Sequence, residues 1–352
     1  MNTSKKITII DIAEALGVSK TLVSLVLSGK GDEHGISKVL QEKVLKKAQE
    51  LNYNYRIFKG IKTKTNVVAI ILPEISSPFS VNFFEKVQLY LLNYGYSTIL
   101  AISDYKVEKE KSLINTFIDK QVEGIIIHSI NNDTNFWKEI NYEELPILFI
   151  KNIPTQLICN YALVDNLLAG QQATEYLLAN GHKHIACLIN KNDSAYYSFF
   201  EGYKLAFNNS LENYNDFYFV ELENEKKQSI VHKLLSEWLN NEVLPTAIVS
   251  GSYDITLSII KACNELKIKI PTQLSLISYD DTEVFEILNP SITSISFPYD
   301  SLAKFSAEAI IKINKKLKAN RKLENLEQAK FEGNLVIRES VSKYNIDLMI
   351  VR

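Results

Sequence analysis

The sequence contains little cysteine and no long hydrophobic run. Its 352 residues include three cysteines, Cys159, Cys187 and Cys263, which are far apart and form no CxxC pair. An odd, scattered set of this kind argues against a disulfide framework and a zinc site, and it fits small buried side chains in a reducing cytoplasm. The longest apolar runs, such as VVAIIL at 67–72, are much shorter than the roughly 20 residues that cross a bilayer, and the N-terminus has no signal segment. We therefore expect a cytoplasmic protein that has no contact with a membrane.

Motifs for catalysis and for cofactors are also missing. The five histidines, His34, His128, His182, His184 and His232, form no HExxH motif, and the chain contains no GxSxG or P-loop sequence. No pair of carboxylates stands out as an acid–base couple. The sequence therefore predicts a protein that is not an enzyme and that binds no metal and no cofactor.

Positive charge is concentrated at the N-terminal end of the chain. Residues 1–65 contain 12 lysines and arginines against 6 aspartates and glutamates, a net charge of +6, whereas the remainder contains 27 and 35, a net charge of −8. A small basic segment attached to a large acidic one indicates that the segment meets a polyanion such as DNA. The alternative is a solvated basic helix, and charge alone does not decide between the two.

The pattern within residues 1–53 predicts three short helices. Thr8 with Asp11 three residues later resembles a capping box at the start of the first helix, which Gly17 ends. Ser19 can cap a second helix, KTLVSLVLS, and a third helix follows the loop KGDEHG. The turn around Gly17 gives the first two helices the spacing of a helix-turn-helix unit. Together with the positive charge, this spacing predicts DNA binding.

The second helix of a helix-turn-helix unit lies in the major groove, and its first residues contact base edges. Lys20, Thr21 and Ser24 lie on the face of this helix opposite its apolar residues, so they are the candidate base contacts. Leu25 has two interpretations, an apolar contact with thymine methyl groups or packing against the third helix. The candidate phosphate contacts are Thr8, Ser19, Ser28 and Lys30. One unit reads few base pairs, so we expect a homodimer on a two-fold symmetric operator in double-stranded DNA.

From residue 66 onward, short β-rich runs alternate with stretches of helical periodicity. The β-rich runs up to residue 150 are VVAIIL, YSTILAI, GIIIH and PILFI, and those after residue 166 are IACLI, FYFV, TAIV and LSLI. Two such series predict an α/β body with two doubly wound parallel sheets, each covered by helices on both faces. A ligand is expected at the carboxyl ends of the strands, where His128 ends the run GIIIH and is a candidate ligand contact.

The order of these motifs resembles that of one protein family. The stretch ITIIDIAEALGVSKTLVSLVLSGKG, followed by ISKVLQEKVLKKAQELNY, is similar to the DNA-binding head of the lactose repressor (LacI/GalR) family of bacterial transcription regulators. The resemblance continues in the segments AIILPEISSPF, VEGIII, VDN, ATEYLLANGHKHIACL, EGYKLAF, YDD, NPSITSI and LVIRES. It implies an all-α helix-turn-helix head and a two-lobed body of the type I periplasmic-binding-protein-like fold.

The resemblance also implies domain boundaries. Residues 1–53 would form the helix-turn-helix domain, 54–65 the hinge, and 66–352 the effector-binding and dimerisation domain. Within that domain the chain would cross between the lobes near 161–164, 290–292 and 325–330. The N-lobe would then contain about 66–162 and 292–327, and the C-lobe about 163–291 and 328–352.

The hinge segment differs from the family pattern, because NYRIFKGIKTKTN contains no proline. By the best match, Ile61 takes the place of the leucine that wedges into the minor groove, flanked by Lys59 and Lys62. A flexible basic linker is the alternative interpretation of the same residues.

For the body, the resemblance implies a small-molecule effector bound between the lobes. Ser77, Phe79 and Asp280 match the family's pocket positions, and a carboxylate such as Asp280 accepts sugar hydroxyls. The residues that stand where the family has other side chains are Lys151, Phe199 and the pair Ser252-Tyr253, unless a one-residue slip puts Asp254 at that place. Core packing is the alternative role for Phe79 and Phe199. The changed residues leave an acidic or otherwise modified sugar open as the effector, and also the absence of any ligand.

These observations predict a sequence-specific DNA-binding transcriptional regulator that acts as a repressor and is controlled by a sugar or sugar derivative. One alternative is a DNA-binding regulator with a degenerate pocket that is controlled by a protein partner. The other is a sugar-binding transport protein, which would need an export signal and would have no use for the basic segment.

Overall fold

The structure, a computed structural model, describes residues 8–27, 29–51, 65–140, 145–191, 194–210, 212–223, 226–319 and 325–344. The chain divides into two compact units, the head (Met1–Thr65) and the body (Asn66–Arg352). Each unit has a hydrophobic core of its own.

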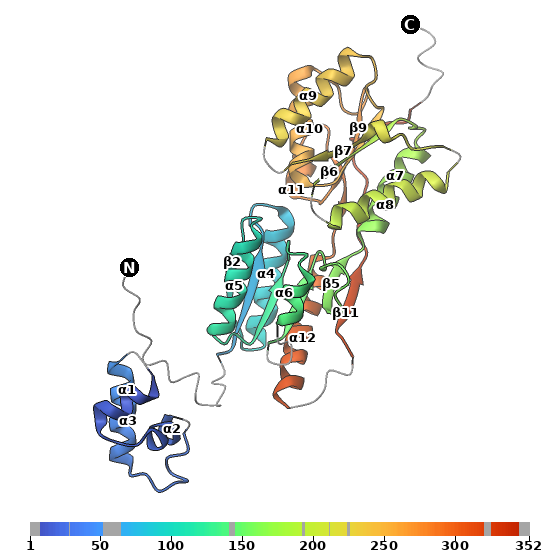
Figure 1. The fold of residues 1–352 in the computed structure, drawn as a ribbon. Coiled ribbons are helices and arrows are strands. Elements are labelled where there is room, and N and C mark those ends of the chain that lie inside the picture. Colours follow the sequence, from blue (N-terminus) through green and yellow to red (C-terminus); the bar gives the residue numbers. More distant parts are fainter. Residues whose placement is uncertain are drawn as a thin grey trace, which may run out of the picture. The chain divides into compact units, whose positions relative to one another are not determined.

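The described part of the head contains three helices, α1 (Ile9–Leu16), α2 (Lys20–Leu27) and α3 (Lys38–Glu50) (Figure 1). Its core is built from apolar side chains of all three helices. Its fully buried members are Ile12, Val23, Leu27, Val44 and Ala48. The core is small, so the stability of the head depends on a few side chains.

Local capping explains where these helices begin and end. The Asp11 carboxylate accepts the backbone N–H of Thr8 at 2.6 Å, and Ser19 Oγ accepts the backbone N–H of Leu22 at 3.1 Å. Gly17 has a φ of 62°, a left-handed conformation that suits glycine, and it ends α1 at the turn toward α2. The predicted helix-turn-helix unit is therefore confirmed.

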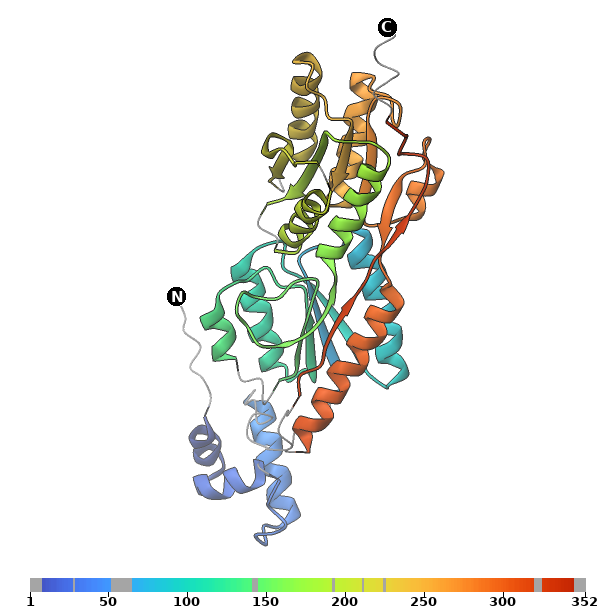
Figure 2. The same cartoon turned by 90° about the vertical axis from the view of Figure 1, so that its right-hand side faces the viewer.

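The described part of the body contains two six-stranded sheets, and the first is parallel throughout, with the order β11-β5-β4-β3-β1-β2. Its strands are β1 (Val67–Leu72), β2 (Ser97–Ile102), β3 (Gly124–Ile127), β4 (Ile147–Ile150), β5 (Asn160–Val164) and β11 (Gln328–Phe331), and its helices are α4 (Pro78–Asn93), α5 (Val107–Asp119), α6 (Thr134–Glu139) and α12 (Tyr299–Lys318). Alternate side chains of β1 point to opposite faces: Ile70 packs in the core with α4 and α12, and Ile71 packs with α5 and α6. Helix α12 lies beside α4 in both views (Figures 1 and 2).

The second sheet has the order β12-β10-β9-β8-β6-β7. Of its described strands, β12 is antiparallel to its neighbour and the others are parallel. Its strands are β6 (Ile185–Asn190), β7 (Phe219–Leu222), β8 (Ala247–Ser250), β9 (Ser275–Tyr279), β10 (Thr293–Ser296) and β12 (Asn334–Val336), and its helices are α7 (Asn166–Ala179), α8 (Ser194–Asn208), α9 (Lys227–Asn240), α10 (Tyr253–Leu266) and α11 (Glu283–Ile287), with a 3₁₀ turn at Asp216–Tyr218. Helices α7 and α8 cover one face, and α9 and α10 cover the other. The alternating pattern of the sequence thus predicted the α/β class and the two doubly wound sheets correctly.

The chain crosses between the sheets at later residues than predicted. Strand β10 at 293–296 pairs with β9, so it belongs to the second sheet, whereas the prediction assigned 292–327 to the N-lobe. Strand β11 at 328–331 pairs with β5, so it belongs to the first sheet, whereas the prediction assigned 328–352 to the C-lobe. The runs TSIS and QAKF are short and half polar, so their residue pattern predicts strands only weakly. The sheet to which each belongs is decided by its pairing with strands that are distant in the sequence. As predicted, α12 returns to the first lobe.

The three cysteines are buried, as the sequence predicted for small apolar side chains. Within the described residues, no helix is both long and apolar enough to cross a bilayer. The same residues contain no group of three His, Cys, Asp or Glu side chains placed to hold a metal ion.

Candidate functional site

The exposed face of α2 is the candidate DNA-binding surface of the head. Its opposite face is buried through Val23, Val26 and Leu27. Among the predicted contacts, Thr8, Ser19, Lys20, Thr21 and Lys30 are exposed, and Ser24 and Leu25 are half-buried. This surface offers an ammonium group and hydroxyls, which are suitable partners for base edges and phosphates.

Leu25 had two interpretations, and its position favours one of them. In the described head, the core and the partly buried side chains packed on it come from other residues. A half-buried Leu25 on the recognition helix therefore favours an apolar contact with DNA over packing against α3. The predicted contacts Ser28, Lys59, Ile61 and Lys62 lie outside the described residues.

A cavity of about 440 Å³ lies between the two lobes of the body, at the carboxyl ends of strands from both sheets. Its lining consists of Glu74, Ser76, Ser77, Tyr105 and Lys151 from the first lobe, and of Asn190, Tyr196, Lys227, Ser252, Tyr253, Asp254 and Asp280 from the second. The predicted effector residues that the structure brings together here are Ser77, Lys151, Tyr253 and Asp280. Parallel strands that end at one edge explain why such distant segments meet.

Two buried charged residues stand directly after strands on the two sides of this cavity. Lys151 follows β4 and is 6% exposed, and Asp280 follows β9 and is 2% exposed. Both have left-handed backbones, with φ of 65° for Lys151 and 73° for Asp280. Such a conformation costs a residue with a side chain about 1–3 kcal/mol and is typical of functional sites. The Lys151 ammonium lies 5.0 Å from the ring centre of Phe79 and 5.2 Å from that of Tyr196.

The cavity also contains buried acceptors that no described group satisfies. Asp280 Oδ1 and Asn190 Oδ1 are buried and accept no hydrogen bond from the described residues. Burial raises the pKa of the Asp280 carboxyl to about 6, and the nearby positive charge of Lys151 limits that rise. Since an unmet buried acceptor is unfavourable, these oxygens are suited to receive the hydroxyl donors of a ligand.

The other two carboxylates of the lining are already engaged. Glu74 accepts hydrogen bonds from the backbone N–H of Ser77 and from the Ser76 hydroxyl, both at 2.7 Å. Asp254 forms an ion pair with Lys227 and accepts a hydrogen bond from Ser252. The remaining charged side chains of the lining are Lys151 and Asp280, and the positive charge of Lys151 acts on the Asp280 carboxyl.

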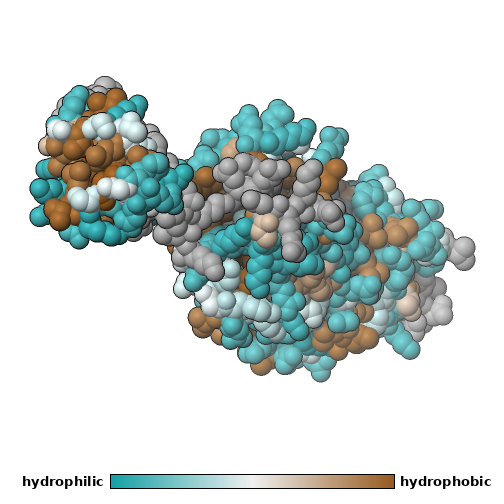
Figure 3. Space-filling model, turned by 90° about the horizontal axis from the view of Figure 1, so that it is seen from below, coloured by the Kyte–Doolittle hydropathy of each residue, from teal (hydrophilic) through white to brown (hydrophobic). Residues whose placement is uncertain are grey.

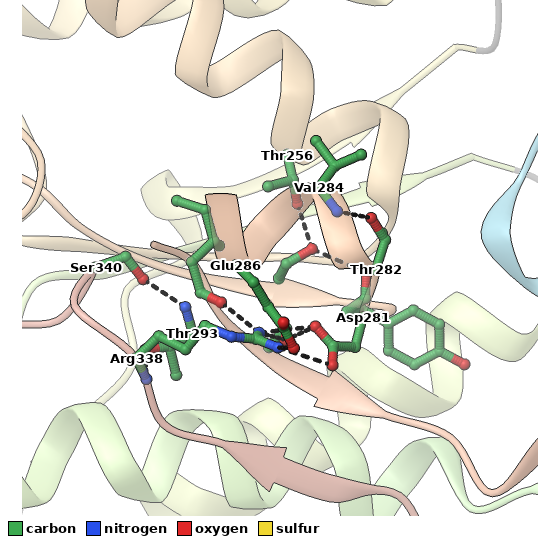
Figure 4. Close-up of polar contacts among 12 residues, drawn as sticks. Thr256, Asp281, Thr282, Val284, Glu286, Thr293, Arg338 and Ser340 are labelled. Atoms are coloured by element: carbon green, nitrogen blue, oxygen red, sulfur yellow. Dashed lines mark hydrogen bonds and ion pairs between the residues drawn. The ribbon is translucent and has the colours of Figure 1, made fainter. Parts of the chain in front are cut away.

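A polar network fixes the chain immediately after Asp280 (Figure 4). Arg338 donates to both carboxylate oxygens of Asp281, at 2.7 and 3.1 Å, and Ser294 donates to Asp281 at 2.6 Å. The Thr282 hydroxyl accepts the backbone N–H of Val284 at 2.9 Å and so caps α11. Asp280 is therefore not needed to cap α11, and its carboxylate accepts the backbone N–H of Tyr253.

Three predicted effector residues lie behind the cavity and outside its described lining. Phe79 is buried and stacks on Phe83, with ring centres 5.8 Å apart, so it contributes to the site as a ring beneath Lys151. His128 is buried near Phe79, and its burial, with the charge of Lys151, lowers its pKa, which favours the neutral imidazole. Phe199 is fully buried and packs on Tyr279, with ring centres 5.1 Å apart.

The position of Phe199 corrects the sequence prediction by one helical turn. A Cβ on Gly170 of α7 would lie 2.0 Å from the carbonyl oxygen of Phe199, so α7 and α8 are in backbone contact there and Phe199 belongs to the core. Tyr196, three residues earlier on α8, is on the same side of the helix and reaches the cavity instead. The structure therefore favours the core-packing interpretation of Phe199, and Tyr196 is the residue of α8 in the cavity lining.

Sequence reasoning missed several residues of the lining. These residues are Glu74, Ser76, Tyr105, Asn190, Tyr196 and Lys227. Asn190 is the last residue of β6, so its place at a strand end was a usable signal. Tyr105 and Lys227 stand apart from the strand ends and reach the cavity through the tertiary fold, which no local pattern encodes.

Comparisons with known proteins match parts of both the head and the body. Residues 8–54 match the family model "Bacterial regulatory proteins, lacI family", and residues 174–341 match "Periplasmic binding protein-like domain". The HTH-type transcriptional regulator DegA of Bacillus subtilis is 27% identical, over 97% of this chain and 99% of that protein. Catabolite control protein A of Priestia megaterium is 29% identical, over 84% of this chain and 89% of that protein.

The solved structures support the same fold. One of them is a periplasmic binding protein/LacI transcriptional regulator from Alkaliphilus metalliredigens QYMF, complexed with D-xylulofuranose. It superposes with a TM-score of 0.67 at 21% identity, over 79% of this chain and 99% of that one. With a helix-turn-helix head that matches the family model and a periplasmic-binding-protein-like body, the chain belongs to the lacI family of DNA-binding bacterial transcription regulators.

Proposed function

We propose that the protein is a repressor that binds a two-fold symmetric operator and is controlled by a small-molecule effector, a sugar or sugar derivative, held between the lobes of its body. The observation that carries the proposal is the cavity lined from both lobes, in which Asp280 Oδ1 and Asn190 Oδ1 are buried without a described partner. Oxygen acceptors of this kind suit a ligand rich in hydroxyl groups. The related regulator complexed with D-xylulofuranose supports this ligand class.

Control of DNA binding follows from the two-lobed cavity. A ligand that contacts both lobes favours the arrangement in which it makes more contacts, and only this difference in affinity shifts the equilibrium. The start of the body is firmly attached to the first lobe, because Glu123 accepts the backbone N–H of Asn66 at 3.1 Å and also binds Lys318 at 2.6 Å. Movement of the first lobe would therefore be passed to the segment that leads to the head.

A homodimer would place two heads on the two half-sites of the operator. The outer side of α4 exposes Val81, Leu89 and Leu92, and Ile287 of α11 is 83% exposed. Apolar patches of this sort interrupt the hydrophilic surface in the space-filling view (Figure 3). Phe285 of α11 is fully buried against Tyr253, with ring centres 5.6 Å apart, so it is not exposed for such an interface. We propose the exposed side chains of α4 and α11 as parts of the dimer interface.

Selection of binding sites from a random DNA pool tests operator recognition, and the full chain is expected to select an inverted repeat. Lys20→Ala should change the preferred base at one position of each half-site, since an exposed lysine at the start of α2 can donate to guanine. The preference for that base should fall about tenfold or more, as a specific contact contributes about 1–3 kcal/mol. Lys38→Ala is the control, because Lys38 is exposed on α3 and should at most weaken all sequences alike. An unchanged preference in Lys20→Ala would show that α2 is not the reading helix.

Calorimetry with a panel of sugars and sugar derivatives tests the effector. At least one compound is expected to bind the full chain and to change its affinity for the selected operator. Specific operator binding that no compound of the panel alters would contradict control by such an effector. That result would favour the alternative in which a protein partner controls the regulator.

A further inference from the structure

The first residue of the body is held by one buried carboxylate. Glu123 stands directly before β3 and is 7% exposed. Its Oε1 accepts the backbone N–H of Asn66 at 3.1 Å. Its Oε2 accepts hydrogen bonds from Asn314 Nδ2 at 2.9 Å and from Lys318 Nζ at 2.6 Å. Burial opposes the ionisation of this carboxyl, but these donors lower its pKa on balance, which favours the carboxylate. Glu123 therefore joins the start of the body to the last turns of α12.

The backbone of Asn66 is fixed on both of its sides. Its N–H belongs to the peptide group shared with residue 65, so the hydrogen bond to Glu123 orients the chain on the side that leads to the head. Its carbonyl oxygen accepts the backbone N–H of Ser97 at 2.7 Å. Its φ is 49°, a left-handed conformation that few residues other than glycine and asparagine adopt readily. The body itself thus determines the direction in which the chain leaves it.

A second glutamate holds α12 to the first lobe. The carboxylate of Glu327, directly before β11, accepts hydrogen bonds from Lys312 at 2.8 Å and from Lys316 at 3.2 Å, and the Glu327 side chain is 12% exposed. Among the described contacts of Glu327, none is with Asn66. The contact with Asn66 therefore distinguishes Glu123 from a carboxylate that only fastens this helix.

The direction of the exit at Asn66 matters because a dimer must place two heads on one operator. The predicted hinge of roughly 12 residues could extend to about 40 Å. A hinge that is free at its start would let each head reach half-sites at many separations, and it would lower the effective concentration of the second head at its half-site. A fixed start removes part of this freedom, so the dimer should favour one separation of the half-sites.

We propose that Glu123 is a positioning residue for operator binding, which fixes the exit of the chain at Asn66 and thereby sets the separation of half-sites that the dimer binds tightly. The proposal rests on the proposed function, because it requires two heads on a two-fold symmetric operator. In this role Glu123 acts through Asn66 and has no contact with DNA. Loss of its side chain should therefore weaken binding to two half-sites without changing how one head reads its base pairs.

Operators that differ in length at their centre test the proposal. Fluorescence anisotropy compares three duplexes with the full chain: the inverted repeat that it selects, the same repeat with one base pair added at the centre, and a single half-site. The added base pair rotates one half-site by about 35° and moves it by about 3.4 Å, so the unaltered protein should lose about tenfold or more in affinity. In Glu123→Ala this loss should shrink to about threefold or less, and affinity for the selected repeat should fall about tenfold. Affinity for the single half-site should change less than about twofold, because one head needs no fixed exit.

Glu327→Ala is the matched control, because it removes a carboxylate that binds two lysines of α12 and leaves the contact with Asn66 in place. It should keep the full loss of affinity on the added base pair. Urea unfolding followed by tryptophan fluorescence shows whether each variant is folded. If Glu123→Ala is unfolded, the comparison rests on Glu123→Gln, in which an amide N–H replaces an acceptor that Asn314, Lys318 and Asn66 share.

The outcomes separate this inference from the proposed function. A folded Glu123→Ala or Glu123→Gln that shows the full loss of affinity on the added base pair would overturn the inference. An unaltered protein that selects an inverted repeat but binds the lengthened repeat equally well would also overturn it, while leaving the proposed function intact. Failure of the unaltered protein to select any inverted repeat would contradict the proposed function, and the inference with it.

Discussion

Replacing Leu27 with alanine is expected to abolish operator binding while leaving the body folded. Leu27 is the last residue of α2 and is fully buried in the small core of the head. Truncating a buried leucine to alanine costs about 2–5 kcal/mol, and a domain of this size has little stability in reserve. The head of the variant should therefore be largely unfolded, and operator affinity should fall at least a hundredfold.

The positions of the tryptophans allow the two units to be followed separately. The chain has 2 tryptophans, Trp137 and Trp238, and both are buried in the body. In Leu27→Ala, urea unfolding followed by tryptophan fluorescence should match the unaltered protein, whereas the helical circular dichroism signal should be smaller before the main transition. Ile10→Ala is the control, since Ile10 is on α1 but is 48% exposed, and it should retain both signals. Full operator binding by Leu27→Ala would contradict the dependence of the head on Leu27. A displaced fluorescence transition would contradict the independence of the two units.

The head could be predicted in detail because its determinants are local. The pairing of Thr8 with Asp11, the cap at Ser19 and the turn at Gly17 each involve residues within four positions of one another. Helix capping of this kind is recorded directly in the sequence pattern. For the same reason, the outward face of α2 followed from the positions of its buried valines.

The body was predictable in class but not in its connections. The alternation of strands and helices predicts two parallel sheets. Which sheet contains β10 and which contains β11 depends instead on pairing with strands that are distant in the sequence. The site shows the same limit. Lys151 and Asp280 were found through the resemblance to the family's pocket positions. Tyr196 was missed because the depth at which α8 meets α7 decides which of its turns reaches the cavity.

Asp280→Asn is expected to stabilise the body, and the gain should depend on pH. The carboxyl of Asp280 is fully buried, and burial raises its pKa from the usual 3.8 to about 6. Lys151 opposes this rise, and Asp254 and Glu74 add to it. The folded state therefore binds the proton more tightly than the unfolded state, so this contribution to stability is present below about pH 4 and is lost as the pH rises through 6.

Above that range the ionised carboxylate of Asp280 costs the fold about 3 kcal/mol, since one pKa unit corresponds to about 1.4 kcal/mol. Asparagine has nearly the same shape and cannot ionise, so Asp280→Asn should be more stable by about 3 kcal/mol at pH 8 and by less than about 1 kcal/mol at pH 4. Urea unfolding followed by tryptophan fluorescence at the two pH values measures the difference. Asp281→Asn is the control with the opposite sign, because Asp281 is the ion-pair partner of Arg338 and its loss should destabilise the body at pH 8.

The gain in stability of Asp280→Asn over the unaltered protein should be larger at pH 8 than at pH 4. If it is not, the ionised carboxylate of Asp280 does not destabilise the fold. The expected gain in stability of Asp280→Asn bears on function. A buried residue that lowers the stability of the fold at neutral pH is explained if its charge serves to bind a ligand. Its carboxylate is suited to accept the hydroxyls of an effector, and an asparagine provides one acceptor where the carboxylate provides two. We therefore expect the stabilised Asp280→Asn protein to bind its effector more weakly. Substitutions that stabilise a protein by removing a polar group from a binding site commonly weaken ligand binding.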